Sequence, residues 1–168
     1  MAKQQEERFN GYASTYELRA YIRKKLRSLA GAIANGTAKD TMKTGNYIVM
    51  LEDILELPYY ESCPNVFYLL HHLKEVTMEI DDRLKMATEE VERLRERADE
   101  INLAEAEEGY LIPDEESEYL NSLKEKAREL WEEIILTEAD IEALQREKQL
   151  CNNLKGIICR PEGFFKNL

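Results

Sequence analysis

The sequence has few of the residues that interrupt helices or cross-link small proteins. Of its 168 residues, only 7 are glycine, 4 are proline and 3 are cysteine. The scarcity of glycine and proline argues against a fold of many short strands and turns. Three cysteines, an odd number, do not make a disulfide framework, so we expect free thiols in a reducing compartment.

Long apolar runs are missing as well. No stretch approaches the 18 or so uncharged apolar residues of a membrane-spanning helix, and the opening MAKQQEERFNGY lacks the apolar core of a secretory signal. We therefore expect a cytoplasmic protein with no membrane contact.

Charge is abundant and unevenly placed. The net charge is −11, yet residues 1–45 hold nine Lys or Arg against four Asp or Glu, whereas the remainder holds 14 against 30. Such asymmetry bears on partners and association more than on the fold.

The basic residues cluster in a predicted first helix. Ser14 to Glu17 fit a capping box at its start, and Asn35-Gly36 should end it. An apolar stripe follows the helical period: Leu18, Ile22, Leu26, Leu29 and Ile33. Arg19, Arg23 and Arg27 form a ladder beside that stripe, and Lys24 lies on the far side. A second helix is predicted from about Gly45 to Leu57, before Pro58.

Two longer segments carry a heptad pattern. The first has two series of positions: Leu70, Thr77, Leu84, Val91 and Ala98, and Val66, Leu73, Ile80, Ala87, Leu94 and Ile101. The second, after Pro113, is marked by Leu120, Leu123, Ala127, Leu130, Ile134, Ile141 and Leu144. Two such helices with a short connection should fold back on each other, and the second should end before Gly156. We predict an all-α protein: a small helical base (1–62), a long antiparallel helical hairpin forming a coiled-coil arm (63–155), and an apolar tail (156–168) packed on the base.

Metal and catalytic motifs are weak. The predicted fold-back brings Cys63 near Cys159, and His71 near Cys151, but the members of each chain-adjacent pair, Cys63/His71 and Cys151/Cys159, lie eight residues apart. Structural zinc sites use pairs two to four residues apart, so these four are weak metal candidates only. No phosphate-binding loop, nucleophile elbow or zinc-protease motif is present. We expect no cofactor and no enzyme.

The arginine ladder has three interpretations. It is a solvated face, a contact with acids of the protein's own arm or of a second copy, or a site for an external anionic surface. Direct nucleic-acid binding is not expected, because the acidic arm would repel phosphate and the segment between the two N-terminal helices is long for a helix-turn-helix.

The predicted hairpin tip is acidic around a short apolar turn. It is either a solvated loop or an anchor that enters a basic groove of a partner. The residues concerned are Glu107, Glu108, Tyr110, Leu111, Ile112, Asp114, Glu115, Glu116 and Glu118. In outline this tip resembles that of the Gre-type transcript-cleavage factors, on the strength of Gly109, Leu111, Glu118 and Tyr119 at a somewhat different spacing. The resemblance implies an acidic coiled coil inserted into an RNA polymerase channel.

The sequence therefore predicts a non-enzymatic interaction protein that binds another protein through the acidic arm, the basic N-terminal helix or both, as a small phage-type inhibitor or an adaptor. The alternative is a regulator of a nucleic-acid machine, acting through the tip or by mimicking phosphates. A homodimer is also predicted, since a four-helix bundle would cover outer apolar residues of the arm. These are Met78, Trp131, Ile135 and Leu136.

Overall fold

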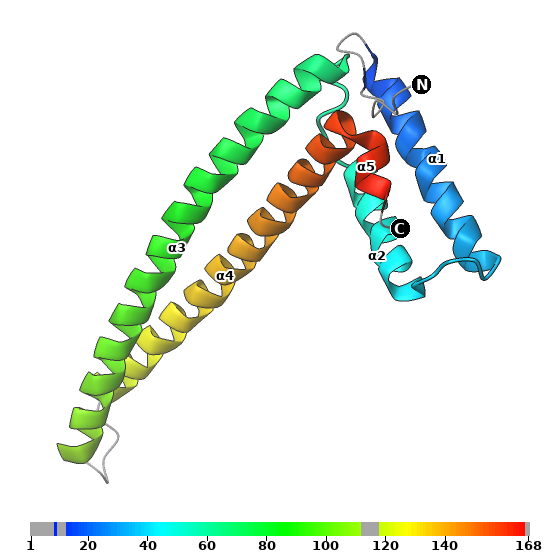
Figure 1. Cartoon of the computed structure of the whole chain (residues 1–168). Helices are drawn as coiled ribbons and strands as arrows, with labels where there is room; N and C mark the ends of the chain where they lie inside the picture. Colours follow the sequence, from blue (N-terminus) through cyan, green and yellow to red (C-terminus); the bar gives the residue numbers. More distant parts are fainter. Residues whose placement is uncertain (1–8, 10–12, 112–117, 167–168) are drawn as a thin grey trace, which may run out of the picture. The chain divides into compact units, whose positions relative to one another are not determined.

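A computed structural model describes the chain except residues 1–8, 10–12, 112–117 and 167–168, and except the side chains of 108–111. The protein is all-α, as predicted. Its helices are α1 (Thr15–Ala34), α2 (Thr41–Leu55), α3 (Val66–Leu111), α4 (Glu118–Cys159) and α5 (Pro161–Phe165) (Figure 1). Within the described ranges, none of these helices combines the length and the apolar character needed to cross a membrane.

Helix α1 begins and ends where the sequence indicated. The Ser14 hydroxyl accepts a hydrogen bond from the Glu17 N–H at 3.1 Å, which satisfies one of the free donors of the first turn. Leu18 and Ile22 on its apolar stripe are fully buried. The helix stops at Asn35, and Gly36 has φ 69°, a left-handed conformation that glycine adopts without strain.

Helix α2 starts earlier than predicted. Its first residue is Thr41, because the Asp40 carboxylate accepts a hydrogen bond from the Lys43 N–H at 3.1 Å and caps the helix there. Gly45 therefore lies inside the helix, and the connection from α1 comprises only residues 35–40. The prediction took the glycine as the helix start and passed over the aspartate cap.

Helices α3 and α4 pack as an antiparallel hairpin (Figure 1). All the predicted heptad positions are buried or half-buried, from Val66 to Ile101 on α3 and from Leu120 to Leu144 on α4. The heptad pattern is thus confirmed as the packing pattern of the two helices. Helix α3 ends at Leu111, and α4 runs past its predicted end, through Gly156 to Cys159.

The chain forms two compact units. One comprises residues 1–79 with 147–168, and the other, residues 80–146, is called here the hairpin unit. The core of the first unit brings together α1, α2, the start of α3 and the end of α4, with Phe164 and Phe165 of α5 packed against it. Its fully buried side chains include Leu18, Ile22, Leu51, Ile54, Leu69, Leu73, Cys151, Leu154 and Ile157. The hairpin unit is centred on Leu94, Ala98, Leu130 and Ile134.

Candidate functional site

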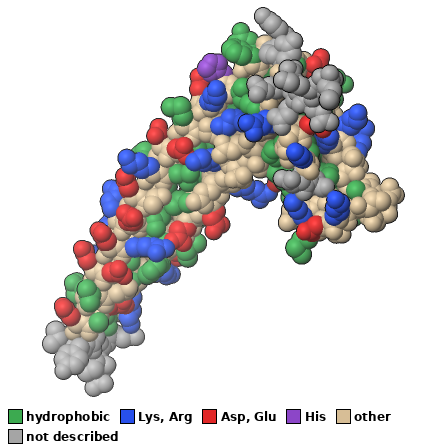
Figure 2. Space-filling view, in the orientation of Figure 1, with side chains coloured by type: hydrophobic (Ala, Val, Ile, Leu, Met, Phe, Trp, Pro, Cys, Tyr) green, Lys and Arg blue, Asp and Glu red, His purple; other side chains and the backbone are tan. Residues whose placement is uncertain are grey.

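The net charge of the hairpin unit is more negative than that of the whole protein. Residues 80–146 hold nine Lys or Arg and 22 Asp or Glu, a net charge of −13 against −11 for the chain. The inward heptad positions are almost all apolar, and the described carboxylates of this unit are exposed except those of Glu90, Glu105 and Glu138, which are half-buried. Figure 2 shows acidic side chains along the hairpin with apolar ones between them. A net charge of this sign gives the surface a negative potential, which favours cationic groups over anionic ones.

Large apolar side chains are nonetheless exposed on this acidic unit. Among the described residues they are Met86, Leu103, Tyr119, Trp131, Ile135 and Leu136, between 43% and 69% exposed. None of them occupies a heptad position, so the packing of α3 on α4 leaves them in solvent. Exposed apolar groups on a charged surface are a mark of binding surfaces when they gather beside a groove.

Such a groove lies between the two helices of the hairpin unit. It is lined by Met86, Ala87, Glu89, Glu90 and Arg93 of α3 and by Thr137 of α4, and has a volume of about 340 Å³. We call it the Met86 groove.

Several polar groups of the Met86 groove already have partners within the protein. Glu90 forms an ion pair with Arg93 one turn away. The Thr137 hydroxyl donates to the Glu133 carbonyl oxygen at 2.8 Å, so it serves its own helix. What remains for a partner is an apolar surface, chiefly Met86, beside the carboxylate of Glu89. An apolar floor with an acidic edge suits a basic segment that carries an apolar side chain.

The predicted arginine ladder is not a uniform surface. The Arg19 guanidinium lies over the ring of Tyr60, 5.1 Å from its centroid, and its buried Nε has no hydrogen-bond partner in the described part of the chain. Arg23 is half-buried, whereas Lys24 and Arg27 are exposed. Burial raises the pKa of Tyr60, an effect that the charges of Arg19 and Arg23 oppose. Arg19 thus packs within its own unit, and Lys24 and Arg27 are the members that face solvent.

The four weak metal candidates do not assemble into a site. Cys63 and Cys151 are buried and Cys159 is exposed, while the His71 ring contacts that of Phe67 at 5.7 Å between centroids. Across the described residues there is no group of three or more His, Cys, Asp or Glu side chains able to hold a metal ion.

Cys151 instead belongs to a polar cluster that the sequence did not reveal. Tyr59, from the segment before α3, donates a hydrogen bond to Glu147 of α4, and Cys151 lies one turn beyond Glu147 beside both. Burial and the Glu147 carboxylate raise the pKa of the Cys151 thiol to about 11. A thiol held in its protonated form is a poor nucleophile. The four-residue spacing of Glu147 and Cys151 was readable, but nothing in the sequence placed Tyr59 against them.

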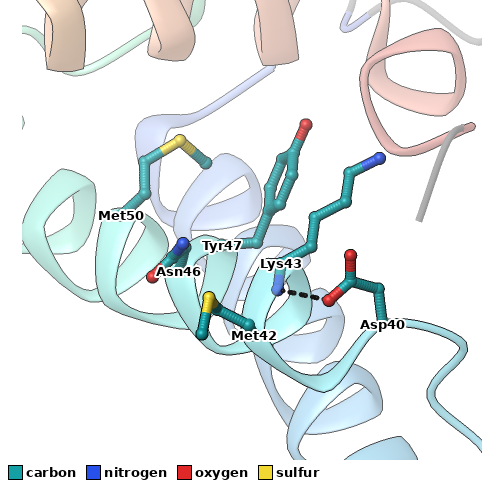
Figure 3. Close-up of a pocket in the computed structure, with 6 residues that line it drawn as sticks. All are labelled: Asp40, Met42, Lys43, Asn46, Tyr47 and Met50. Atoms are coloured by element: carbon teal, nitrogen blue, oxygen red, sulfur yellow. Dashed lines mark hydrogen bonds between the residues drawn. The ribbon is translucent and has the colours of Figure 1, made fainter.

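A further hollow lies on the surface of α2. It has a volume of about 500 Å³ and is lined by Asp40, Met42, Lys43, Asn46, Tyr47 and Met50. Figure 3 shows the side chains of Lys43 and Tyr47 extending in the same direction, and the bond drawn there from the Lys43 N–H to Asp40 is the helix cap. These lining residues include neither histidine nor cysteine; they supply two thioethers, a phenol, an amine, an amide and the Asp40 carboxylate that caps α2.

Most residues of the predicted hairpin tip are not among those that the structure describes. Glu107 and Glu118 are exposed. The side chains of Glu108, Tyr110 and Leu111, together with Ile112, Asp114, Glu115 and Glu116, fall outside the described residues.

Comparisons with protein-family models, with curated proteins and with solved structures gave no match to this chain.

Proposed function

We propose that the protein acts without catalysis, by binding another protein through the hairpin unit. The observation that carries the proposal is the Met86 groove, in which exposed apolar surface adjoins the exposed carboxylate of Glu89 on a unit of net charge −13. Electrostatic attraction over that surface speeds encounter with a basic partner, and burial of Met86 would provide a centre of binding energy. The partner is a basic protein segment that presents an apolar side chain.

The chemistry of the side chains supports a role in binding rather than in catalysis. Enzyme sites need a concave pocket in which polar groups converge on the reacting atoms. The Met86 groove offers no such convergence, since Glu90 is paired with Arg93 and Thr137 with its own helix. Cys151, the buried thiol with a shifted pKa, is held in the unreactive form.

Regulation of a nucleic-acid machine is the second candidate, and it depends on the acidic charge alone. A phosphate mimic, or an acidic tip inserted into a basic channel, would need the carboxylates of the hairpin but not the thioether of Met86. The two proposals therefore differ in how they depend on one apolar side chain.

The test begins with a partner captured on the full chain from the native host and identified by mass spectrometry. Its affinity is then measured for Met86→Gln, for Glu89→Gln, and for Leu103→Gln, a control on the same helix with the same exposure outside the groove. We expect Met86→Gln to weaken binding by about tenfold, the loss of one well-buried anchor. Leu103→Gln should bind as the wild type does. A partner whose affinity falls on adding salt but ignores Met86→Gln would favour phosphate mimicry, and one that ignores both groove substitutions would refute the Met86 groove.

A further inference from the structure

We propose that two copies of the chain pair through the outer face of α4, about a two-fold axis at Ile135. This face is separate from the Met86 groove and lies wholly within the hairpin unit. Trp131, Ile135 and Ala139 are all exposed, although the preceding Ile134 is 1% exposed in the core. Residues four apart are offset by only about 40° around a helix, so the three side chains form one apolar stripe.

The stripe on one copy fits the same stripe on a second copy that runs in the opposite direction. A two-fold axis at Ile135 sets the two α4 helices antiparallel and brings residues equally distant from Ile135, on either side, opposite each other. Trp131, the single tryptophan of the chain, then meets the small Ala139 of the second copy, and Ile135 meets itself. A large side chain opposite a small one is what allows two helices to interdigitate closely.

The charges that flank the stripe obey the same symmetry. Arg128 stands seven residues before Ile135 and Glu142 seven after it, so each copy's Arg128 faces the other's Glu142. Both pairs are lost in a parallel arrangement, which would set like charges together. Arg128 also has an exposed ion pair with Glu125 of its own chain, which leaves it able to exchange partners.

Beyond these pairs the symmetry becomes unfavourable. Lys124 faces Arg146 of the second copy, about 16 Å from the axis by helix rise. Two helices that cross at about 50° have separated at that distance, so the like charges favour a short crossing contact over a long parallel one.

A short crossing contact of one helix face is smaller than the roughly 800 Å² per partner of a standard interface, and the two hairpin units also repel each other. We therefore infer a reversible dimer that forms in the micromolar range. A second copy is the occupant favoured by the observations because the stripe and its flanking charges complement themselves, which is the property of a two-fold interface.

The first test is the mass of the full chain in solution. Sedimentation should show a 19.6 kDa monomer at about 1 µM and twice that mass near 100 µM. Emission from Trp131 should shift to shorter wavelength over the same range, because the dimer buries the ring. Ile135→Lys sets two cations on the axis and should leave a monomer at every concentration, with unchanged circular dichroism. Leu136→Lys is the matched control: it is equally exposed but about 100° further around the helix, and should dimerise normally.

The second test reverses the flanking charges. Arg128→Glu and Glu142→Arg should each weaken dimerisation by about tenfold, and the variant that carries both should regain the wild-type affinity. An equimolar mixture of the two single variants should form heterodimers, because each then supplies the charge that the other lacks. A wild-type chain that stays monomeric at 100 µM, an Ile135→Lys variant that still dimerises, or charge reversals that do not compensate each other would overturn the proposal.

Discussion

The ring of Phe164 lies against the backbone at Gly156, where a side chain would otherwise stand. A β-carbon built on Gly156 would be 3.1 Å from Cδ2 of that ring, closer than carbon atoms normally approach, and 3.4 Å from Cε2. Helix α4 continues past Gly156 to Cys159, so the glycine is an interior residue of the helix. The glycine makes room for α5 against α4 and does not act as a helix terminator.

The contact predicts opposite outcomes for glycine-to-alanine substitutions in different helices. Alanine normally stabilises a helix interior by about 0.5–1 kcal/mol relative to glycine. We expect that gain for Gly31→Ala in α1 and Gly45→Ala in α2, where nothing beyond the adjacent residues and the backbone of the same helix lies within 4 Å of the added methyl group. Gly156→Ala should instead cost about 1 kcal/mol, because Phe164 is held by the rings of Tyr47 and Phe165. Urea unfolding of the three variants measures this, and a gain at Gly156 equal to that at Gly45 would show that Phe164 yields freely.

Arg19 and Arg27 should respond differently to the same substitution. Arg19→Gln removes the guanidinium from the Tyr60 ring and exposes part of the core beneath its stem, which should lower the free energy of unfolding by about 1–2 kcal/mol. Arg27 is exposed, and Arg27→Gln should change that free energy by less than about 0.5 kcal/mol. Thermal and urea unfolding give both values. Equal small effects would mean that Arg19 belongs to the solvated surface after all.

Adjacent isoleucines on α4 offer a test of the heptad core. Ile134 is 1% exposed and packs with Leu94, Ala98 and Leu130, so Ile134→Ala should cost about 2–4 kcal/mol. Ile135→Ala should cost less than about 0.5 kcal/mol when measured near 1 µM, where the chain is expected to be monomeric. If the two substitutions cost the same, the register of α3 against α4 would differ from the one described.

The packing of α3 on α4 could be predicted from the sequence for a simple reason. A heptad pattern reports burial directly, because apolar residues that recur at this spacing lie along one face of a helix. Leu94 on that face of α3 packs with Ile134 on the corresponding face of α4. The start of α2 is also encoded locally, because Asp40 is a typical N-cap residue. The prediction instead placed the helix start at Gly45, since glycine is common at helix boundaries.

Other features depend on contacts between residues far apart in the chain. Gly156 is read correctly only when Phe164 is known to lie on it, and Arg19 only when Tyr60 is known to lie beneath it. The cluster of Tyr59, Glu147 and Cys151 joins a short segment before α3 to the last third of α4. Such contacts leave no periodic pattern in the sequence, so the sequence predicted the packing of α3 on α4 better than the interior of the first unit.

The raised pKa of Cys151 makes stability depend on alkaline pH. The thiol has an ordinary pKa near 9.0 when unfolded and about 11 when folded, because burial and the Glu147 carboxylate disfavour the thiolate. The folded state therefore holds its proton more tightly. The stabilisation is fully present below pH 9 and is lost as the pH rises toward 11. Between pH 8 and pH 10 the free energy of unfolding should fall by about 1 kcal/mol from this group.

Urea unfolding across that pH range isolates the thiol when variants are compared. Cys151→Ala should be less stable than the wild type at pH 8, because it leaves a small cavity, but its stability should fall less with pH. Cys159→Ser, at an exposed position, should keep the wild-type pH dependence. Tyr59 and Tyr60, whose pKa values are also raised by burial from 10.0, contribute as the pH approaches 10, and the difference between the wild type and Cys151→Ala removes their share. A Cys151→Ala variant whose stability falls as steeply as that of the wild type would place the thiol in a solvated environment and contradict its burial beside Glu147.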